Sequence, residues 1–243
     1  MFTSDKVKQV KKTVAGISLF LGLVLLLVVF LPAIIQEIKY LYNPYKDGEV
    51  KVITHSHVEE REPIFSCSAG KNKSILFSGI KNDVRCDLKN TKKQIVFTDD
   101  NFGLVIPKIG VNVSVVENVD PLDQEQYSQS LKQGVVHSKF SGLPDDNKTM
   151  FIFGHSSNNV YDLGGYNFVF YLLSKLVKGD VFYIAYKGDI YKYKVVDKKT
   201  VSDRDVDYLK FNDENVAVML MTCWPPGTDK KRLLIFARQD GES

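Results

Sequence analysis

The sequence is poor in cysteine and histidine, and its excess of positive charge is confined to one end. Only three of its 243 residues are cysteine and four are histidine. The formal net charge of +3 is accounted for by residues 1–13, in which four lysines outnumber Asp5, so the remaining chain sums to zero. A nucleic-acid-binding domain carries a basic face, so this charge balance indicates no nucleic acid partner.

The sequence also lacks internal repeats and low-complexity segments. A chain of this length accommodates one ordinary domain of about 100 to 200 residues together with an anchor and a connecting segment, but hardly two full domains. We therefore expect a single hydrophobic core.

Charged residues are absent from residues 14–35, where most side chains are Leu, Val, Ile or Phe. This stretch suits a transmembrane helix, which needs about 20 apolar residues. Lysines precede it and only Glu37 and Lys39 follow closely, so the bias predicts a cytoplasmic N-terminus and an extracytoplasmic remainder. The run exceeds the apolar core of a signal peptide, about 7 to 15 residues, so we expect an uncleaved single-pass anchor rather than a removed signal.

The composition of the remaining chain changes along its length and divides it into segments. A segment with Asn-Pro and Asp-Gly turns, a run of charges and no sustained apolar period reads as a stalk. Short apolar pieces at 75–77 and 95–97 then suggest a strand-rich extension. The predicted organisation is a cytoplasmic tail at 1–13, an anchor at 14–35, a stalk at 36–62, the extension at 63–100 and a C-terminal domain at 101–243.

The C-terminal domain is predicted to be all-β. Only 123–132 and 168–177 look helical, and a Lys-Gly-Asp turn at 187–189 has the spacing of a β-hairpin. Because strands dominate, a closed or nearly closed barrel is the natural way to remove sheet edges. Runs of β-branched and aromatic residues predict strands at 104–106, 111–116, 134–137, 150–153, 181–186, 191–196, 216–221 and 233–236.

The three cysteines have different surroundings. An extracytoplasmic location permits disulfides, and an odd count leaves one thiol unpaired. Cys67 and Cys86 lie close together in one polar segment, so pairing them is the simplest arrangement and leaves Cys223 free. The alternative is that Cys67 and Cys86 are isolated thiols.

Cys223 ends a predicted strand and precedes a Trp-Pro-Pro-Gly loop, a position that exposes a side chain on a rigid frame. A buried structural cysteine is the alternative. A nucleophilic thiol needs a nearby base or cation, because the thiolate is the reactive form. His155 ends an apolar strand and opens a polar loop, so we favour it over His137, which could be packed inside.

Arg232 opens the last predicted strand, nine residues after Cys223. A hairpin returning from the cysteine loop would bring its guanidinium toward the thiol, where it could hydrogen-bond a developing oxyanion. A surface arginine in the basic cluster at 230–232 is the alternative.

Three separated motifs, TCWPPG at 222–227, RLLIFA at 232–237 and FGHS at 153–156, resemble the signature regions of sortases in the family's order. The likeness covers roughly residues 102–238, including IPKI at 106–109. It implies an eight-stranded β-barrel with short helices, preceded by the transmembrane helix. The segment 63–100 matches no part of the common sortase core.

The resemblance implies that Cys223 is the nucleophile, His155 the acid/base and Arg232 the group that steadies substrate and oxyanion. His137 matches no catalytic position, and Arg238 follows the final apolar run instead of preceding it. The implied reaction is transpeptidation. Cys223 would cleave a C-terminal sorting motif of secreted proteins through a thioester, and an amine of a cell-wall precursor or pilin lysine would accept the acyl group.

Two other functions are weighed against this one: an extracytoplasmic cysteine hydrolase, and a non-enzymatic, membrane-anchored binding barrel with an inert Cys223. We expect no cofactor. Acids at 145–146 and at 203, 205 and 207 could bind calcium, which some sortases use, but a calcium site needs six to eight oxygens in defined geometry. His55 and His57 have no zinc-like spacing to other ligands.

Overall fold

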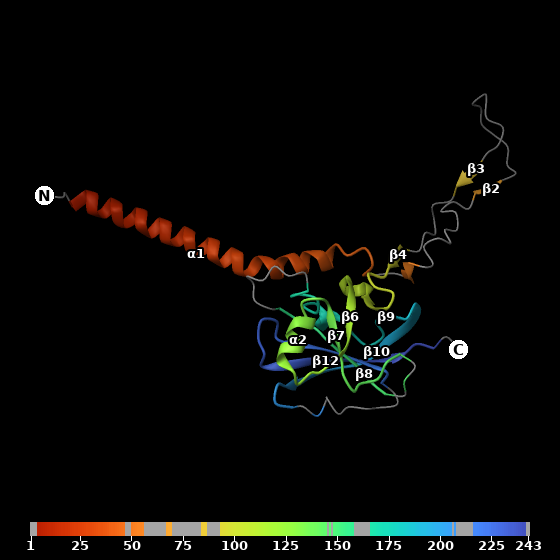
Figure 1. Ribbon diagram of the computed structural model, residues 1–243. Coiled ribbons are helices and arrows are strands. Elements are labelled where there is room, and N and C mark those ends of the chain that lie inside the picture. The colour runs from red at the N-terminus through yellow and green to blue at the C-terminus, as the bar shows by residue number, and fades with distance from the viewer. Residues whose placement is uncertain are drawn as a thin grey trace, which may run out of the picture.

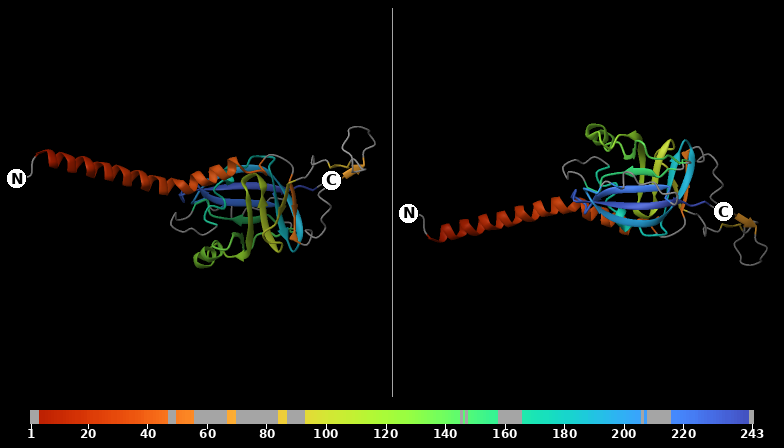
Figure 2. Two further views of the ribbon diagram at one scale, coloured as in Figure 1. Left: turned by 90° about the horizontal axis from the view of Figure 1, so that it is seen from above. Right: turned by 90° about the horizontal axis from the view of Figure 1, so that it is seen from below.

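The computed structural model combines one long helix with a barrel (Figure 1). It describes residues 4–46, 50–55, 67–69, 84–86, 93–144, 146, 148–157, 166–205, 207 and 216–241. The helix α1 (Ser4–Leu41) projects away from the barrel in all three views (Figures 1 and 2).

Eight strands close the barrel in the order β10-β12-β11-β8-β7-β6-β5-β9. Most neighbours are antiparallel, whereas β6 with β7 and β8 with β11 are parallel pairs. The eight predicted strands and the barrel are therefore confirmed. The strands are β5 (Phe102–Ile106), β6 (Val111–Val119), β7 (Val135–Ser138), β8 (Met150–Phe153), β9 (Val181–Tyr186), β10 (Asp189–Ser202), β11 (Val218–Trp224) and β12 (Lys231–Gln239).

The predicted hairpin between β9 and β10 is also confirmed, since Tyr186 pairs with Asp189 across a two-residue turn. Lys187 and Gly188 in this turn have φ angles of 52° and 90°. Positive φ at both central positions is the type I′ geometry, whose twist matches that of the flanking strands.

Of the two predicted helices, the first is confirmed as α2 (Gln124–Ser130), with Asp123 accepting a hydrogen bond from Gln126 N–H as its N-cap. The second was wrong in extent. Within 168–177, only the 3₁₀ helix η3 (Leu173–Lys175) is helical. Phe170, Leu172, Leu173 and Leu176 are all buried, and the Phe170 N–H donates to the barrel instead of to a helical carbonyl.

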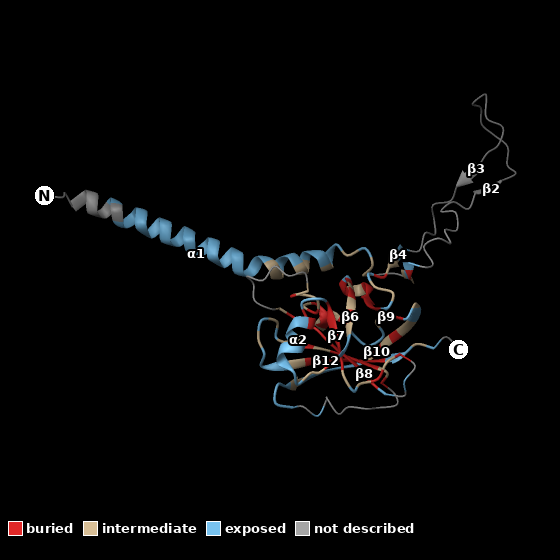
Figure 3. Ribbon diagram, viewed as in Figure 1, coloured by how far each residue is buried: buried red, intermediate tan, exposed pale blue. Residues whose placement is uncertain are grey.

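The buried residues of the barrel, red in Figure 3, form two apolar clusters. Side chains pointing into the barrel form the main core, including Ile152 of β8, Leu220 of β11 and Ile235 of β12. The opposite faces of the same strands form a second cluster, which α2 partly covers with Tyr127 and Leu131. The period of two therefore assigns each residue of these strands to one face.

The C-terminal end of α1 packs against the barrel. Glu37 forms an ion pair with Lys175 at 3.1 Å, and Tyr40 packs against the main core. Beyond the helix, Asn43 Nδ2 donates to the carbonyl oxygens of Pro107 and Lys108 at 2.7 and 3.0 Å. These two belong to η2 (Pro107–Ile109), so the chain leaving the helix is tied to the turn between β5 and β6.

The stretch Lys11–Leu41 of α1 is long and apolar enough to cross a membrane and includes the predicted anchor at 14–35. Its side chains are exposed along most of its length (Figure 3). This helix fits a single-pass membrane anchor.

Two small sheets lie between α1 and the barrel in sequence. Within the predicted stalk, β1 (Val50–Ile53) pairs in parallel with β4 (Lys93–Val96), which falls in the predicted extension. The strands β2 (Cys67–Ala69) and β3 (Val84–Cys86) form an antiparallel pair. The predicted strand at 75–77 lies outside the described residues.

Cys67 and Cys86 occupy directly opposite positions in the register of β2 and β3. Opposite Cα atoms in antiparallel sheets lie about 4.5 to 5.5 Å apart, within the span of about 4.4 to 6.8 Å that a disulfide bridges. We therefore predict that these two cysteines are oxidised to one disulfide. Alkylation of the denatured protein should add one group without reductant and three after reduction, whereas three additions without reductant would contradict the pairing.

Candidate active site

The candidate catalytic residues lie at one end of the neighbouring strands β8, β11 and β12. Cys223 continues the face of β11 that carries Met219 and Met221, and both methionines belong to the second apolar cluster. On β12, Arg232 continues the face of Leu234 and Phe236, which belong to the same cluster. Cys223 and Arg232 therefore project from the same side of the sheet.

Cys223 and Arg232 are direct partners in the antiparallel register of β11 and β12. Side chains at opposite positions of such a pair have Cβ atoms about 4.5 to 5.5 Å apart. The loop at 225–230 thus returns the chain so that the arginine stands beside the thiol, as the sequence suggested. Arg238 lies at the other end of β12, opposite Lys194 of β10, roughly 20 Å from Arg232 along the strand.

His155 follows the end of β8, which runs parallel to β11 with Phe153 opposite Met221. The pairing continues past the strand, since Gly154 N–H donates to the Met221 carbonyl at 3.1 Å. Two residues beyond the Phe153–Met221 pair, the same register brings His155 beside Cys223. His155 is half-buried, and its carbonyl accepts a hydrogen bond from Phe170 N–H at 2.9 Å.

The Cys223 thiol is half-buried and is not in a disulfide. Burial raises the pKa of the thiol, because desolvation disfavours the thiolate. The positive charge of Arg232 acts in the opposite direction and lowers this pKa, and the carboxylate of Asp229 raises it again. Burial is the largest of the three effects, so the pKa of the thiol lies above its ordinary value, and formation of the reactive thiolate requires removal of a proton.

Arg232 is held by the turn that precedes it. Its Nη1 donates to the carbonyl oxygens of Asp229 and Lys231 at 2.6 and 3.1 Å. A guanidinium has five N–H donors, so these two bonds leave others for a ligand. Among the described residues no carboxylate forms an ion pair with Arg232, so its charge remains available to an anion that develops near the thiol.

Three features beside the candidate residues had no assigned role in the sequence. Thr222 is buried, and its Oγ1 donates to the Gly154 carbonyl at 2.8 Å, which fastens the residue before Cys223 to the residue before His155. A Cβ at Gly154 would lie 2.9 Å from the Phe170 ring. Ser156 is buried, and its Oγ has no hydrogen-bond partner within the described part of the chain. The FGHS and TCWPPG motifs contain Gly154, Ser156 and Thr222, but only the pairing of distant strands brings Thr222 to Gly154.

His137 lies apart from this group, in β7, and is buried. Its Nδ1 accepts from Asn118 N–H at 3.2 Å, and its Nε2 donates to the Gly142 carbonyl at 2.9 Å and contacts Ser141 Oγ at 2.9 Å. Asn118 has a φ angle of 61° and lies where the pairing of β6 and β7 shifts register. The neutral ring therefore stabilises a bulge in β6, which is a structural role.

This role predicts a pH dependence of stability. Burial lowers the pKa of His137 below its ordinary value of 6.5, so below pH 6.5 the unfolded chain binds more protons than the folded one. The contribution of His137 is fully present above pH 6.5 and is lost as the pH falls toward the lower folded pKa.

Urea unfolding of the full chain in detergent micelles between pH 7.5 and 5, for wild type and His137→Gln, measures this dependence. We expect the wild type to lose more free energy of unfolding than the variant across this range, and His55→Gln, on an exposed residue, to behave like the wild type. Equal losses in wild type and His137→Gln would contradict the prediction.

Within the described residues, no group of three or more His, Cys, Asp or Glu side chains is arranged to hold a metal ion. The predicted calcium ligands Asp203 and Asp205 use carboxylate oxygens to accept from Ser202 Oγ and Asp207 N–H in local turns. Asp145 and His57 lie outside the described residues. The absence of a cofactor stays a prediction, with calcium as its alternative.

Comparison with known proteins places the barrel in a family. The family model for the sortase domain matches residues 104–240, more than half of the chain. The chain is 29% identical over 139 residues to Sortase D of Bacillus subtilis (strain 168), a match that covers 56% of this chain. The match spans 62% of that relative's length.

Solved structures with a similar arrangement include sortase C-1 from Actinomyces oris. It is 28% identical, with a TM-score of 0.49, over 59% of this chain and 76% of that chain. Another is a Clostridium perfringens Sortase D5 transpeptidase, 25% identical with a TM-score of 0.47, over 59% of this chain and 80% of that chain.

Proposed function

This chain belongs to the sortase family, and on that premise we propose that it is a membrane-anchored cysteine transpeptidase whose nucleophile is Cys223. Sortases are transpeptidases that use a cysteine. The observation that carries the assignment of residues is the register of β11 and β12, in which Cys223 stands opposite Arg232. His155 joins them because Gly154 continues the parallel pairing of β8 with β11.

In the first half of the proposed reaction, the Cys223 thiol loses its proton to solvent, and the thiolate sulfur attacks the carbonyl carbon of a threonine in the C-terminal sorting motif of a secreted protein. A C–S bond forms, and the peptide C–N bond breaks. His155 donates a proton to the departing amine, which a general acid must do because an amide anion is a poor leaving group. Arg232 stabilises the tetrahedral oxyanion through its remaining N–H groups.

In the second half, an amine of a cell-wall precursor or a pilin lysine attacks the thioester carbonyl. A new C–N bond forms, the C–S bond breaks, and the released Cys223 thiolate takes up a proton from solvent to restore the resting thiol. His155 accepts the proton that the attacking amine loses. The half-buried position of Cys223 supports transfer over hydrolysis, since restricted solvent access disfavours attack by water.

We further propose that the N-terminus is cytoplasmic and that the barrel lies outside the membrane. The lysines that precede the apolar stretch support this orientation. The partners are then secreted proteins with a sorting motif and an extracytoplasmic amine acceptor.

The function is tested by incubating the full-length protein in detergent with threonine-containing sorting-motif peptides, with and without triglycine, and identifying the products by mass spectrometry. We expect a thioester on Cys223 that disappears when the amine is added, together with a peptide–triglycine adduct. A hydrolysed peptide without adduct at high triglycine concentration would identify a hydrolase. No adduct on Cys223 with any peptide, and an alkylation rate equal to that of a model thiol, would favour the binding barrel.

Two substitutions separate the contribution of the positive charge of Arg232 from that of its hydrogen-bond geometry. Arg232→Lys keeps the positive charge that lowers the pKa of Cys223 but loses the planar fork of donors. We expect kcat/KM for peptide transfer to fall about 10²-fold in Arg232→Lys. The pH profile of Cys223 alkylation should stay near that of the wild type in this variant and move to higher pH in Arg232→Gln.

Arg238→Lys is the matched control, since it makes the same change at the far end of β12 and should leave transfer unaltered. The proposed role of Arg232 is wrong if Arg232→Lys retains full transfer activity.

A further inference from the structure

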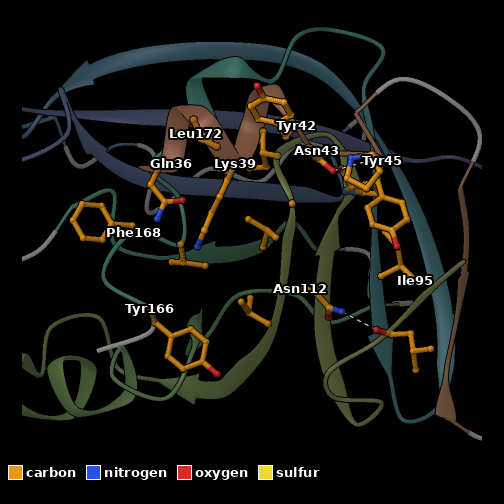
Figure 4. Close-up of a pocket in the computed structure, with 18 of the residues that line it drawn as sticks. Gln36, Lys39, Tyr42, Asn43, Tyr45, Ile95, Asn112, Tyr166, Phe168 and Leu172 are labelled. Carbon is orange, nitrogen blue, oxygen red and sulfur yellow. Dashed lines mark hydrogen bonds between the residues drawn. The ribbon is translucent and has the colours of Figure 1, made fainter. Parts of the chain in front are cut away.

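A cavity of about 810 Å³ lies between the C-terminal end of α1 and the barrel, and Cys223 is not among its lining residues (Figure 4). One wall is formed by α1 and the residues that follow it. The others come from β4, from the turn between β5 and β6, and from residues 166–172. Figure 4 shows Gln36 and Lys39 of α1 extending into this space above Tyr166.

The cavity lies at the level of lipid headgroups if α1 spans a membrane. The apolar stretch ends at residue 35. A helix rises 1.5 Å per residue, so Gln36, Lys39 and Tyr42 lie within about 11 Å beyond the hydrocarbon boundary, and less if the helix is tilted. The headgroup layer on each side of a bilayer is about 5 to 8 Å thick. The cavity therefore begins where the phosphates of the outer leaflet lie.

The charge of the cavity wall is positive. Lys39 is the one charged residue among the described lining residues, which include no acid. The nearest acid on α1, Glu37, is paired with Lys175 at 3.1 Å. Across the described residues no ion pair involves Lys39. An exposed, unpaired ammonium group at the wall of an open cavity is suited to an anionic ligand.

The rest of the lining is amphipathic. Ile109, Val111 and Leu172 supply an apolar surface, whereas Gln36 and Tyr166 supply hydrogen-bonding groups. The side-chain amides of the two lining asparagines are already hydrogen-bonded. Asn43 donates to the carbonyl oxygens of Pro107 and Lys108, and Asn112 Nδ2 donates to the Val96 carbonyl at 2.7 Å. A ligand with one anionic group, further hydroxyls and an attached apolar chain matches this lining.

We propose that this cavity binds the headgroup of an anionic phospholipid, with Lys39 as the partner of its phosphodiester. Two independent observations support this ligand: the position of the cavity along α1, just beyond the apolar stretch, and the single unpaired cation, Lys39, in its wall. The inference rests on the membrane insertion of α1 that forms part of the proposed function. It reaches the catalytic end of the barrel through residues 166–172, because Phe170 N–H bonds to the His155 carbonyl.

The test uses the full-length protein in lipid nanodiscs that contain a phosphatidylglycerol analogue with a photoactivatable diazirine on its glycerol headgroup. After irradiation, mass spectrometry locates the adducts. We expect labelling of the peptides that contain Tyr42 and Tyr166, and an approximately tenfold lower yield in Lys39→Gln, the loss expected for one charge-assisted hydrogen bond. Lys46→Gln is the matched control, since Lys46 lies over the Tyr40 ring outside the cavity and its loss should change the yield by less than about twofold.

Three results would overturn the proposal: adducts confined to the apolar stretch, equal labelling by a phosphatidylcholine analogue with the same diazirine, or equal yields in Lys39→Gln and wild type. Suppression of labelling by millimolar glycerol 3-phosphate would also overturn it, because the site would then recognise a soluble phosphate. Transfer activity is measured on the same nanodiscs. Labelling without peptide transfer would refute the proposed function alone, and transfer without labelling would refute the lipid site alone.

Discussion

Replacing Cys223 with alanine is expected to abolish peptide transfer, with kcat/KM falling by at least about 10³-fold. The thiol is the group that forms the covalent intermediate in the proposed reaction, and the alanine side chain has no nucleophilic atom. Because Cys223 is half-buried at the end of β11, the smaller side chain removes little core packing, so the fold should persist. Mass spectrometry should detect neither the thioester nor the peptide–amine product.

The control is the double variant Cys67→Ala/Cys86→Ala, which removes the other two cysteines of the chain and should retain transfer. Circular dichroism of Cys223→Ala should match that of the wild type, which separates loss of chemistry from loss of fold. A Cys223→Ala protein that still joins peptide to amine at the wild-type rate would show that another residue is the nucleophile.

Replacing His155 with alanine is expected to lower kcat/KM about 10²- to 10⁴-fold, the usual contribution of a general acid/base. The loss should depend on the leaving group. A peptide amide requires protonation of the departing amine, whereas an ester or thioester substrate does not. We therefore expect acylation of Cys223 in His155→Ala to recover substantially with an ester analogue of the sorting peptide.

His55→Ala provides the comparison, since His55 is exposed and bonds to Asp100 far along the chain from β8. It should retain full activity. An equal loss for amide and ester substrates in His155→Ala would contradict a role in protonating the leaving group and would indicate a purely structural contribution from this residue.

The sequence predicted most of the barrel because local signals agree with the fold. The strands coincide with runs of β-branched and aromatic residues, and the Lys187-Gly188 turn has its own hairpin geometry. The candidate residues were also predictable, since Cys223 and His155 each end an apolar strand. Their proximity, in contrast, depends on the parallel pairing of β8 with β11, which no local pattern specifies.

The features that escaped prediction arise from contacts between distant segments. Residues 168–177 contain enough leucine to suggest a helix, but their side chains fill the barrel core and Phe170 N–H bonds to His155. The sequence favoured His155 over His137 as the catalytic histidine, but the contacts of His137 with the Asn118 bulge were not predicted. The cavity beside Lys39 requires the end of α1 to meet β6, a contact that neither segment reveals alone.

The contact between α1 and the barrel limits the range of positions that the barrel can take relative to the helix. A flexible linker of the length predicted for the stalk would let the domain wander over roughly 30 Å. Instead, the Glu37–Lys175 ion pair and the bonds of Asn43 to Pro107 and Lys108 hold the barrel against the end of α1. If α1 spans the membrane as proposed, the barrel lies close to the bilayer. Diffusion of the active site is then confined to a thin layer parallel to the membrane. Reactants presented within that layer gain a high effective concentration, and those presented above it gain none.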